Sequence, residues 1–244
     1  MIPLDHPVTV PFEDGSLQVY QNQSAQEKKR PIIFVHGSPG KAQHWSRYLS
    51  DPDLSERFQL IAYDRPGYAK STRKLHDLDA QIAALVTLIE EQDQPAILVG
   101  HSLGGAVVLG TAARHPDKVH RVLALAASSD PRPSPVYRLN QFLHVTRLGW
   151  LLPNNLRTSH REVLSLFPSL RELQADLTKI NAPVTVVQGL CDRLVPPSNL
   201  PFLEEELRET ELEIIALEKE GHFLPWKQFS LIKSLLLDEP EHSQ

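Results

Sequence analysis

The chain has a single cysteine, Cys191, and no apolar run as long as a membrane-spanning helix. One cysteine excludes an internal disulfide framework, which fits a protein of the reducing cytoplasm. A membrane span needs about 18 consecutive apolar residues. The opening stretch, MIPLDHPVTVPFEDG, has neither the basic start nor the apolar stretch of a secretory signal. We therefore expect a cytoplasmic protein without a membrane span.

The chain also lacks an excess of positive charge, internal repeats and low-complexity tracts. It has 25 Lys and Arg against 30 Asp and Glu, and a formal net charge of -5. This balance argues against general nucleic-acid binding. A length of 244 residues, 41% apolar content and a mean hydropathy of -0.26 are typical of one large globular domain, or of one domain with an insertion. The chain is too short for two full α/β domains.

Strand-like apolar runs alternate with helix-like stretches along most of the chain. This alternation predicts an α/β fold, with a mostly parallel central sheet and helices on both of its faces. The predicted strands are short and rich in β-branched residues, at 32–35, 60–63, 96–99, 119–126, 184–187 and 212–217. Helical periodicity covers 75–89, 103–115, 200–210 and 226–238. Asp14 and Gly15, between two extended runs, predict a hairpin at the edge of the sheet.

Residues 130–178 interrupt the alternation, so we predict a helical lid there, inserted into a core of residues 1–129 and 179–244. The segment opens with prolines at 131, 133 and 135 and contains a helix-like stretch at 142–152. Between 131 and 171 it has six arginines, no lysine and one acid, Glu162. Two interpretations stay open: a solvated helical face, or a lid that favours anionic substrates. The apolar residues of 142–152 form either an interfacial surface or, as we expect, a surface packed onto the active site.

The turn Gly100-His101-Ser102-Leu103-Gly104 is the strongest chemical signal in the sequence. It directly follows a predicted strand and precedes a predicted helix. A serine on such a sharp turn has a strained backbone, and side chains at the flanking glycine positions would collide with the strand or the helix. The unpaired N–H groups at the start of the helix favour a developing oxyanion. We predict that Ser102 is a nucleophile.

A serine nucleophile needs a base, which is usually a histidine oriented by a carboxylate. Asp192 and His222 follow the strands predicted at 184–187 and 212–217, in the order serine, acid, histidine. His222 is preferred among eleven histidines because of this location. Asp130 is the stronger rival for the acid, and Asp117 is the weaker one. We also predict an oxyanion hole formed by the backbone N–H groups of Leu103 and Ser38, in a loop shaped by His36 to Gly40.

Together these segments resemble the α/β-hydrolase fold family, in its lid-bearing branch of esterase-like serine hydrolases. HGSPG at 36–40 is similar to the oxyanion loop, YDRPGYAKS at 63–71 to the D-x-x-G-x-G-x-S segment, and GHSLGG at 100–105 to the nucleophile turn. QGLCDRLVPP at 188–197 and GHF at 221–223 are similar to the acid and base loops. One departure is Ala69, where the family often has glycine, so we expect a less freely bent loop after Asp64.

The resemblance implies hydrolysis of a carboxylic ester or thioester through an acyl-enzyme, with no cofactor or metal and a small-molecule substrate. A carbon–carbon hydrolase or a cofactor-free lyase on the same scaffold is the alternative, and a non-catalytic binding protein is a third. The alternative enzyme would need a polar lid group above Ser102. The candidate substrate-binding residues of the lid are Arg138, His144, Arg147 and Trp150. The oligomeric state is not predicted.

Overall fold

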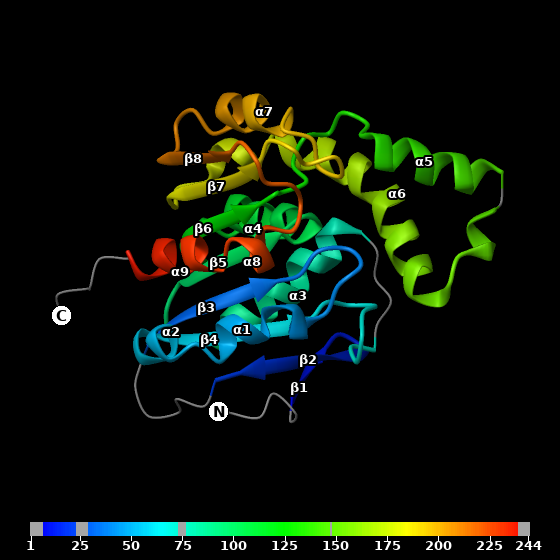
Figure 1. Cartoon of the computed structure of the whole chain (residues 1–244). Coiled ribbons are helices and arrows are strands. Elements are labelled where there is room, and N and C mark those ends of the chain that lie inside the picture. Colours follow the sequence, from blue (N-terminus) through cyan, green and yellow to red (C-terminus); the bar gives the residue numbers. More distant parts are fainter. Residues whose placement is uncertain (1–6, 23–28, 73–76, 147, 239–244) are drawn as a thin grey trace.

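A computed structural model describes residues 7–22, 29–72, 77–146 and 148–238. Its centre is an eight-stranded sheet with the strand order β1-β2-β4-β3-β5-β6-β7-β8 (Figure 1). The strands are β1 (Val8–Phe12), β2 (Gly15–Gln21), β3 (Arg30–Val35), β4 (Phe58–Asp64), β5 (Ala96–His101), β6 (Val119–Leu125), β7 (Val184–Gly189) and β8 (Leu212–Leu217). All six predicted core strands are present, and the α/β fold class is confirmed.

The sheet is parallel from β4 to β8 and antiparallel at the β1 edge. β1 and β2 form a hairpin in which Phe12 pairs with Gly15, as the Asp14-Gly15 pair predicted. β2 then pairs antiparallel with β4. The remaining neighbours pair in parallel, so the carboxyl ends of β3, β5, β7 and β8 lie along one edge of the sheet. Loops that leave these ends are the ones expected to carry the site.

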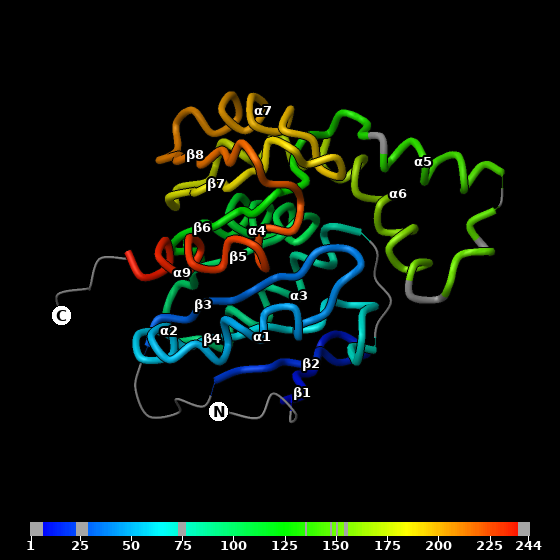
Figure 2. Tube along the Cα trace, viewed as in Figure 1, coloured from blue at the N-terminus to red at the C-terminus, as the bar shows by residue number. Residues whose placement is uncertain are grey.

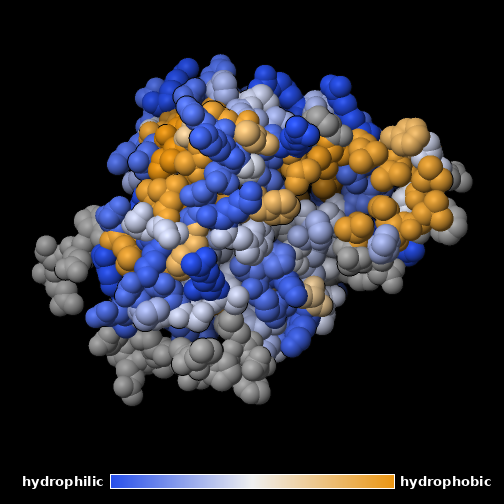
Figure 3. All heavy atoms as spheres, viewed as in Figure 1, coloured by the Kyte–Doolittle hydropathy of each residue, from blue (hydrophilic) through white to orange (hydrophobic). Residues whose placement is uncertain are grey.

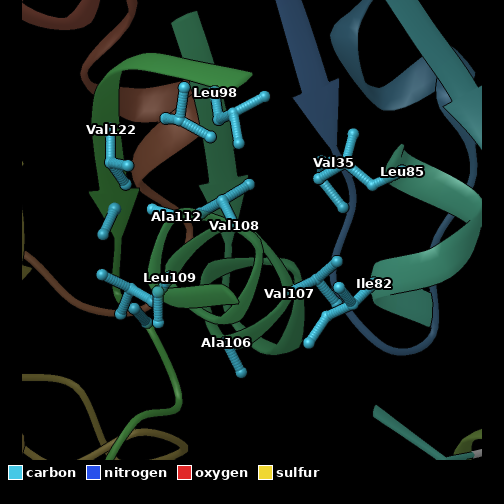
Figure 4. Packing of buried hydrophobic residues seen from close by; sticks show 14 of the residues in the cluster. Val35, Ile82, Leu85, Leu98, Ala106, Val107, Val108, Leu109, Ala112 and Val122 are labelled. Carbon is cyan, nitrogen blue, oxygen red and sulfur yellow. The ribbon is translucent and has the colours of Figure 1, made fainter. Parts of the chain in front are cut away.

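Helices cover both faces of the sheet because the central strands are apolar on both sides. α3 (Leu78–Glu90) and α4 (Leu103–Arg114) pack on one face, where Val35 and Leu98 meet Ile82 and Val108 (Figure 4). The other face is covered by α1 (Ser46–Leu49), α2 (Pro52–Arg57) and α9 (Phe229–Leu237). The remaining short elements of the core are η1 (Ala42–Trp45), η2 (Pro116–Lys118), η4 (Leu177–Lys179), α7 (Asn199–Glu206) and α8 (Leu224–Lys227).

Between β6 and β7 the chain leaves the sheet and forms α5 (Pro135–Val145), η3 (Leu148–Leu151) and α6 (Asn154–Gln174) (Figure 2). The second half of α6 is part of the core, since Leu166, Phe167, Leu170 and Leu173 are buried in the cluster around α4. The first half of α6 and all of α5 project beyond the sheet edge (Figure 1).

The prediction of one helical stretch over 142–152 is wrong in detail. α5 ends at Val145, where both the backbone N–H and the Oγ1 of Thr146 donate to the carbonyl of Phe142. These two hydrogen bonds close the last turn of α5. The next helical element is the separate 3₁₀ turn η3. In the described part of the chain, no helix combines the length and the apolar character that a membrane crossing requires.

Candidate active site

Ser102 lies between the end of β5 and the start of α4, on the strained turn that the sequence predicted. Its φ is 58° and its ψ is -121°, a left-handed conformation that is costly for a non-glycine residue. The turn is held because Ser102 N donates to Leu125 O at 2.9 Å and Ser102 O accepts from Ser128 N at 3.0 Å. A Cβ on Gly104 would lie 2.4 Å from Val35 O, so only glycine fits there.

The loop after β3 lies directly against Ser102. A Cβ built on Gly37 would be 2.9 Å from the Cβ of Ser102, so the two backbones approach closely. Ser38 is the next residue in this loop, and Leu103 is the first residue of α4. Of the two residues predicted to supply the oxyanion N–H groups, Leu103 thus follows Ser102 directly, and Ser38 follows the glycine that approaches Ser102.

His222 and Asp192 meet across the ends of β7 and β8. His222 Nδ1 donates to Asp192 Oδ2 at 2.8 Å, and the Asp192 side chain is fully buried. Asp192 Oδ1 accepts from the backbone N–H groups of Leu194 and Val195 at 2.8 and 3.0 Å. The rival Asp130 instead binds Arg132, whose Nε lies 2.8 and 2.9 Å from its two carboxylate oxygens. Geometry thus pairs His222 with Asp192.

The hydrogen bonds of Asp192 set its charge. Burial alone raises the pKa of this carboxyl, but the bond from His222 and the two backbone N–H groups outweigh burial and lower the pKa. An ionised Asp192 fixes the proton of neutral His222 on Nδ1 and leaves Nε2 as the proton acceptor. In the described part of the chain no hydrogen bond joins His222 to Ser102 Oγ, a looseness that is common in sites without substrate.

His101 contacts the base loop, which the sequence analysis did not predict. Its Nε2 donates to the carbonyl of His222 at 2.8 Å, and the two imidazole rings lie 4.7 Å apart. Burial and the neighbouring His222 lower the pKa of His101 to about 3, although its bond to the His222 carbonyl and the nearby Asp192 carboxylate act in the opposite direction. The His101 side chain thus supports the backbone of His222.

Arg65, which the sequence analysis also missed, holds the loop that carries Ser38. Its Nε donates to His36 O at 2.9 Å and its Nη2 donates to Gly37 O at 3.0 Å. The guanidinium is 0% exposed and forms an ion pair with Glu162 of α6, which is 2% exposed. Burial by itself lowers the pKa of Arg65, but the Glu162 carboxylate raises it, so the guanidinium stays charged.

Tyr68 joins the same network. Its hydroxyl donates to Glu162 and lies 2.7 Å from Ser38 Oγ, which in turn lies 2.8 Å from Ser159 Oγ of α6. Burial and Glu162 raise the pKa of Tyr68, so the phenol stays protonated. Backbone carbonyls and the Ser38 hydroxyl of one loop are thus bonded to side chains of two other segments. We call Arg65, Tyr68, Ser159 and Glu162 the clamp.

These contacts explain the segment at 63–71. The Asp64 carboxylate accepts hydrogen bonds from Ala42 N at 2.8 Å and from Lys70 N at 3.2 Å. The bond from Lys70 closes the turn between Asp64 and Lys70. Ala69 has a φ of 43°, so the loop adopts the left-handed bend without the glycine. The closed turn imposes this conformation on alanine, for which it is costly, and how freely the loop bends stays a prediction.

Two of the four predicted substrate-binding residues of the α5–α6 segment can be placed in the structure. Arg138 and His144 line an open groove of about 1090 Å³ between α5 and α6. Arg147 lies outside the described residues, and so does the side chain of Trp150. Our expectation that the apolar residues of 142–152 pack onto the active site is wrong, since Phe142 is 57% exposed and Val145 is 74% exposed. On α6, Ser159 contacts Ser38 directly, whereas Glu162 is linked to that loop through Arg65 and Tyr68.

Known proteins share this architecture. The chain is 27% identical to the dihydrolipoyllysine-residue acetyltransferase component of the acetoin cleaving system of Pseudomonas putida, over 80% of this chain, and it spans about half of that relative, 47%. It is 29% identical to a pimeloyl-acyl-carrier protein methyl ester esterase of Neisseria meningitidis, over 83% of this chain and 90% of that protein.

Among solved structures, the thioesterase domain from the curacin biosynthetic pathway matches with a TM-score of 0.75 and 18% identity, over 95% of this chain and 99% of that domain. This likeness shows the shared fold. The model of the alpha/beta hydrolase family matches residues 32–228, which is well over half of the sequence. The chain therefore belongs to the alpha/beta hydrolase family.

Proposed function

We propose that the protein is a serine hydrolase that cleaves a carboxylic ester or thioester of a small to medium substrate. Ser102 is the nucleophile, His222 the base and Asp192 the residue that orients the base. The observation that carries this proposal is the 2.8 Å bond from His222 Nδ1 to buried Asp192, at the same sheet edge as a serine on a left-handed turn. A merely structural serine has no need of that strain.

The proposed reaction has two halves. Ser102 Oγ attacks the acyl carbonyl while its proton moves to His222 Nε2, and the new C–O bond leaves negative charge on the former carbonyl oxygen. His222 then protonates the departing oxygen or sulfur, the bond to it breaks, and an acyl-enzyme remains. Water, deprotonated by His222, attacks this ester, and the proton returns to Ser102 as the acid leaves.

Two charges develop during each half, and each has a partner in the proposed site. The imidazolium of His222 is stabilised by ionised Asp192. The oxyanion is stabilised by the backbone N–H groups of Ser38 and Leu103. The clamp supports this role of Ser38. Arg65 binds the carbonyls of His36 and Gly37, and the Gly37 carbonyl belongs to the same peptide group as the Ser38 N–H, so its orientation is fixed. Preorganised donors of this kind cost no reorganisation during the reaction.

We further propose that residues 130–178 act as the lid of this site. Ser159 of α6 bonds to Ser38, and Glu162 of α6 bonds to Arg65 and Tyr68, which themselves bind the loop of Ser38. These bonds couple the segment to the proposed oxyanion hole. The names of two similar proteins, a methyl ester esterase and a thioesterase domain, support ester or thioester chemistry at this level and leave the acyl group open.

A substrate screen tests the proposal. We would measure kcat/KM for p-nitrophenyl esters of increasing chain length and for acyl-CoA thioesters, with Ser102→Ala and the surface control Ser234→Ala. Ser102→Ala is expected to lower turnover by roughly 10³- to 10⁶-fold. Ser234→Ala should match the wild type, because this exposed hydroxyl lies on α9. Undiminished hydrolysis by Ser102→Ala would refute the assignment.

A further inference from the structure

We propose that the exposed apolar side chains of α5, η3 and the first turn of α6 dock onto an anionic lipid surface. We call the protein surface that these side chains form the 139–156 face. It is defined by six exposed apolar side chains: Leu139, Phe142, Val145, Leu148, Leu151 and Leu156. The inference concerns where the protein sits and does not depend on the proposed reaction.

The 139–156 face concentrates apolar surface that no other described segment of the chain covers. Of the eleven large apolar side chains exposed in the described residues, six lie within this one stretch, and their exposed fractions run from 37% to 74%. Figure 3 shows hydrophobic residues gathered over the α5–α6 end of the molecule. Single exposed apolar residues are ordinary, but a contiguous group of this size marks an interaction surface.

Cationic side chains accompany these apolar residues. The groove between α5 and α6 is lined by Phe142 and Val145 of the face together with Arg138, Arg157 and Arg161, and no acid is among its lining residues. Two histidines, His144 and His160, line it as well. An apolar surface flanked by arginines is the pattern of helices that lie in the headgroup region of a bilayer.

The one acid between 131 and 171 does not face outward. Glu162 is the sole Asp or Glu between 131 and 171, and it faces the core, where it is buried against Arg65. Arg132 pairs with Asp130, whereas Arg138, Arg157 and Arg161 line the groove. The chain as a whole has a net charge of -5, so the rest of the molecule is acidic. An anionic membrane would attract this end and repel the body, which orients the protein.

Charge also decides among the possible occupants. A second copy placed symmetrically on the face would bring arginines against arginines. An acidic protein would complement the charge, but it would also have to match the shape of six projecting side chains. A fluid bilayer supplies anionic groups and an apolar layer without such a match, so an anionic lipid surface fits both features.

Co-sedimentation with vesicles tests the proposal. The full chain would be mixed with vesicles of phosphatidylcholine alone and with vesicles containing 30% phosphatidylglycerol, a fraction of about one third chosen to give a strong surface charge. We expect binding to the anionic vesicles, weakening as salt is raised. The double variants Phe142→Ser/Val145→Ser and Arg138→Glu/Arg161→Glu should each bind at least about tenfold more weakly.

Matched controls keep the test specific. Val8→Ser removes an exposed apolar side chain at the opposite sheet edge, and Arg208→Glu reverses an exposed arginine outside the segment, so both should bind like the wild type. Circular dichroism would verify that each variant is folded. Binding to neither vesicle, or binding that the face variants leave unchanged, overturns the proposal. Two other results would also overturn it if no vesicle binding is seen. One is concentration-dependent dimerisation that the face variants abolish. The other is binding of a monomeric anionic detergent that the same variants abolish.

Discussion

The proposed catalytic residues occupy costly positions. The Ser102 backbone is strained and the Asp192 carboxylate is buried, and both need partners that compensate the cost. The left-handed backbone of Ser102 is held by bonds to Leu125 and Ser128. The buried Asp192 carboxylate is compensated by three N–H donors. Strain and burial of this kind persist only where the surrounding structure enforces them, which makes the three residues the centre of the proposed chemistry.

Replacement of Asp192 tests whether this residue orients His222 for catalysis without being needed for folding. Asp192→Asn should lower kcat by about 10⁴-fold, because the amide no longer holds the proton on His222 Nδ1. The fold should survive, since the amide oxygen still accepts from Leu194 and Val195. Steady-state kinetics and circular dichroism check this. The control is Asp130→Asn, which changes the rival acid bound to Arg132 and should cost less than about tenfold. The reverse ranking would make Asp130 the acid.

His101 predicts a pH dependence of stability. Its pKa is about 3 in the folded protein and about 6.5 in an unfolded chain, so the unfolded chain takes up the proton first as pH falls. The stability that neutral His101 contributes is fully present above pH 6.5 and is lost as pH falls toward 3. Between pH 7 and 4.5 the free energy of unfolding should fall by about 2–3 kcal/mol through this residue.

The test compares urea unfolding of wild type and His101→Gln at these two pH values. Glutamine keeps an N–H donor for the carbonyl of His222 but does not titrate. The difference between the two pH values should therefore shrink in the variant, with a remainder from His36, whose pKa burial also lowers. An equal pH dependence in both proteins would contradict the account.

At the scale of elements, the clamp connects three parts of the chain that are distant in sequence. Arg65 follows β4, the loop of Ser38 follows β3, and Glu162 lies on α6, 97 residues after Arg65. The ion pair is fully buried and its guanidinium also binds Gln81 of α3 at 3.1 Å. The position of α6 and the shape of the proposed oxyanion loop are thus coupled.

Glu162→Gln should damage both stability and catalysis. It leaves the Arg65 cation buried without a counterion, which costs about 3–5 kcal/mol in unfolding free energy. It also loosens the loop of Ser38, so kcat should fall by about 10- to 100-fold with a smaller change in KM. Chemical denaturation and steady-state kinetics measure the two effects.

Asp79→Asn is the matched control for the clamp. It removes the acid of the exposed Arg114–Asp79 pair and should cost less than about 1 kcal/mol without changing kcat. If Glu162→Gln is as mild as this control, the clamp does not hold the loop. If Glu162→Gln loses much stability but its folded fraction keeps the wild-type kcat, the clamp stabilises the fold and has no part in catalysis.

The sequence predicted the strands, most helices and the pairing of Asp192 with His222, because each of these depends on local patterns. Parallel strands bring the loops at their carboxyl ends together, so the order of Ser102, Asp192 and His222 was enough to place them at one edge. The clamp could not be predicted in this way. Glu162 stood out as one acid among six arginines, but only the tertiary structure reveals that it turns inward to Arg65.

At the scale of the whole molecule, the α5–α6 segment is partly core and partly free surface. Leu170 on the second half of α6 is 2% exposed and packs in the cluster with α4, whereas Leu139 on α5 is 58% exposed. The boundary between core and projecting segment therefore falls within α6. The sequence analysis assigned all of 130–178 to the lid, so it did not locate this boundary.

A pair of identical substitutions tests this division. Leu170→Ala should lower the free energy of unfolding by about 2–5 kcal/mol, because it opens a cavity beside α4. Leu139→Ala should change it by less than about 0.5 kcal/mol, since that side chain already contacts solvent. Urea denaturation of the two variants measures both values. Equal effects would mean that α5 and the second half of α6 are packed alike.

The central claim is that Ser102 forms the covalent acyl-enzyme, and intact-protein mass spectrometry tests it most directly. The protein would be treated with an organophosphonate serine probe, and the labelled peptide would be identified by fragmentation. The account predicts one adduct on Ser102 in the wild type, slower labelling in His222→Ala and no adduct in Ser102→Ala. An adduct of equal yield in Ser102→Ala, or on a different residue of the wild type, would contradict it.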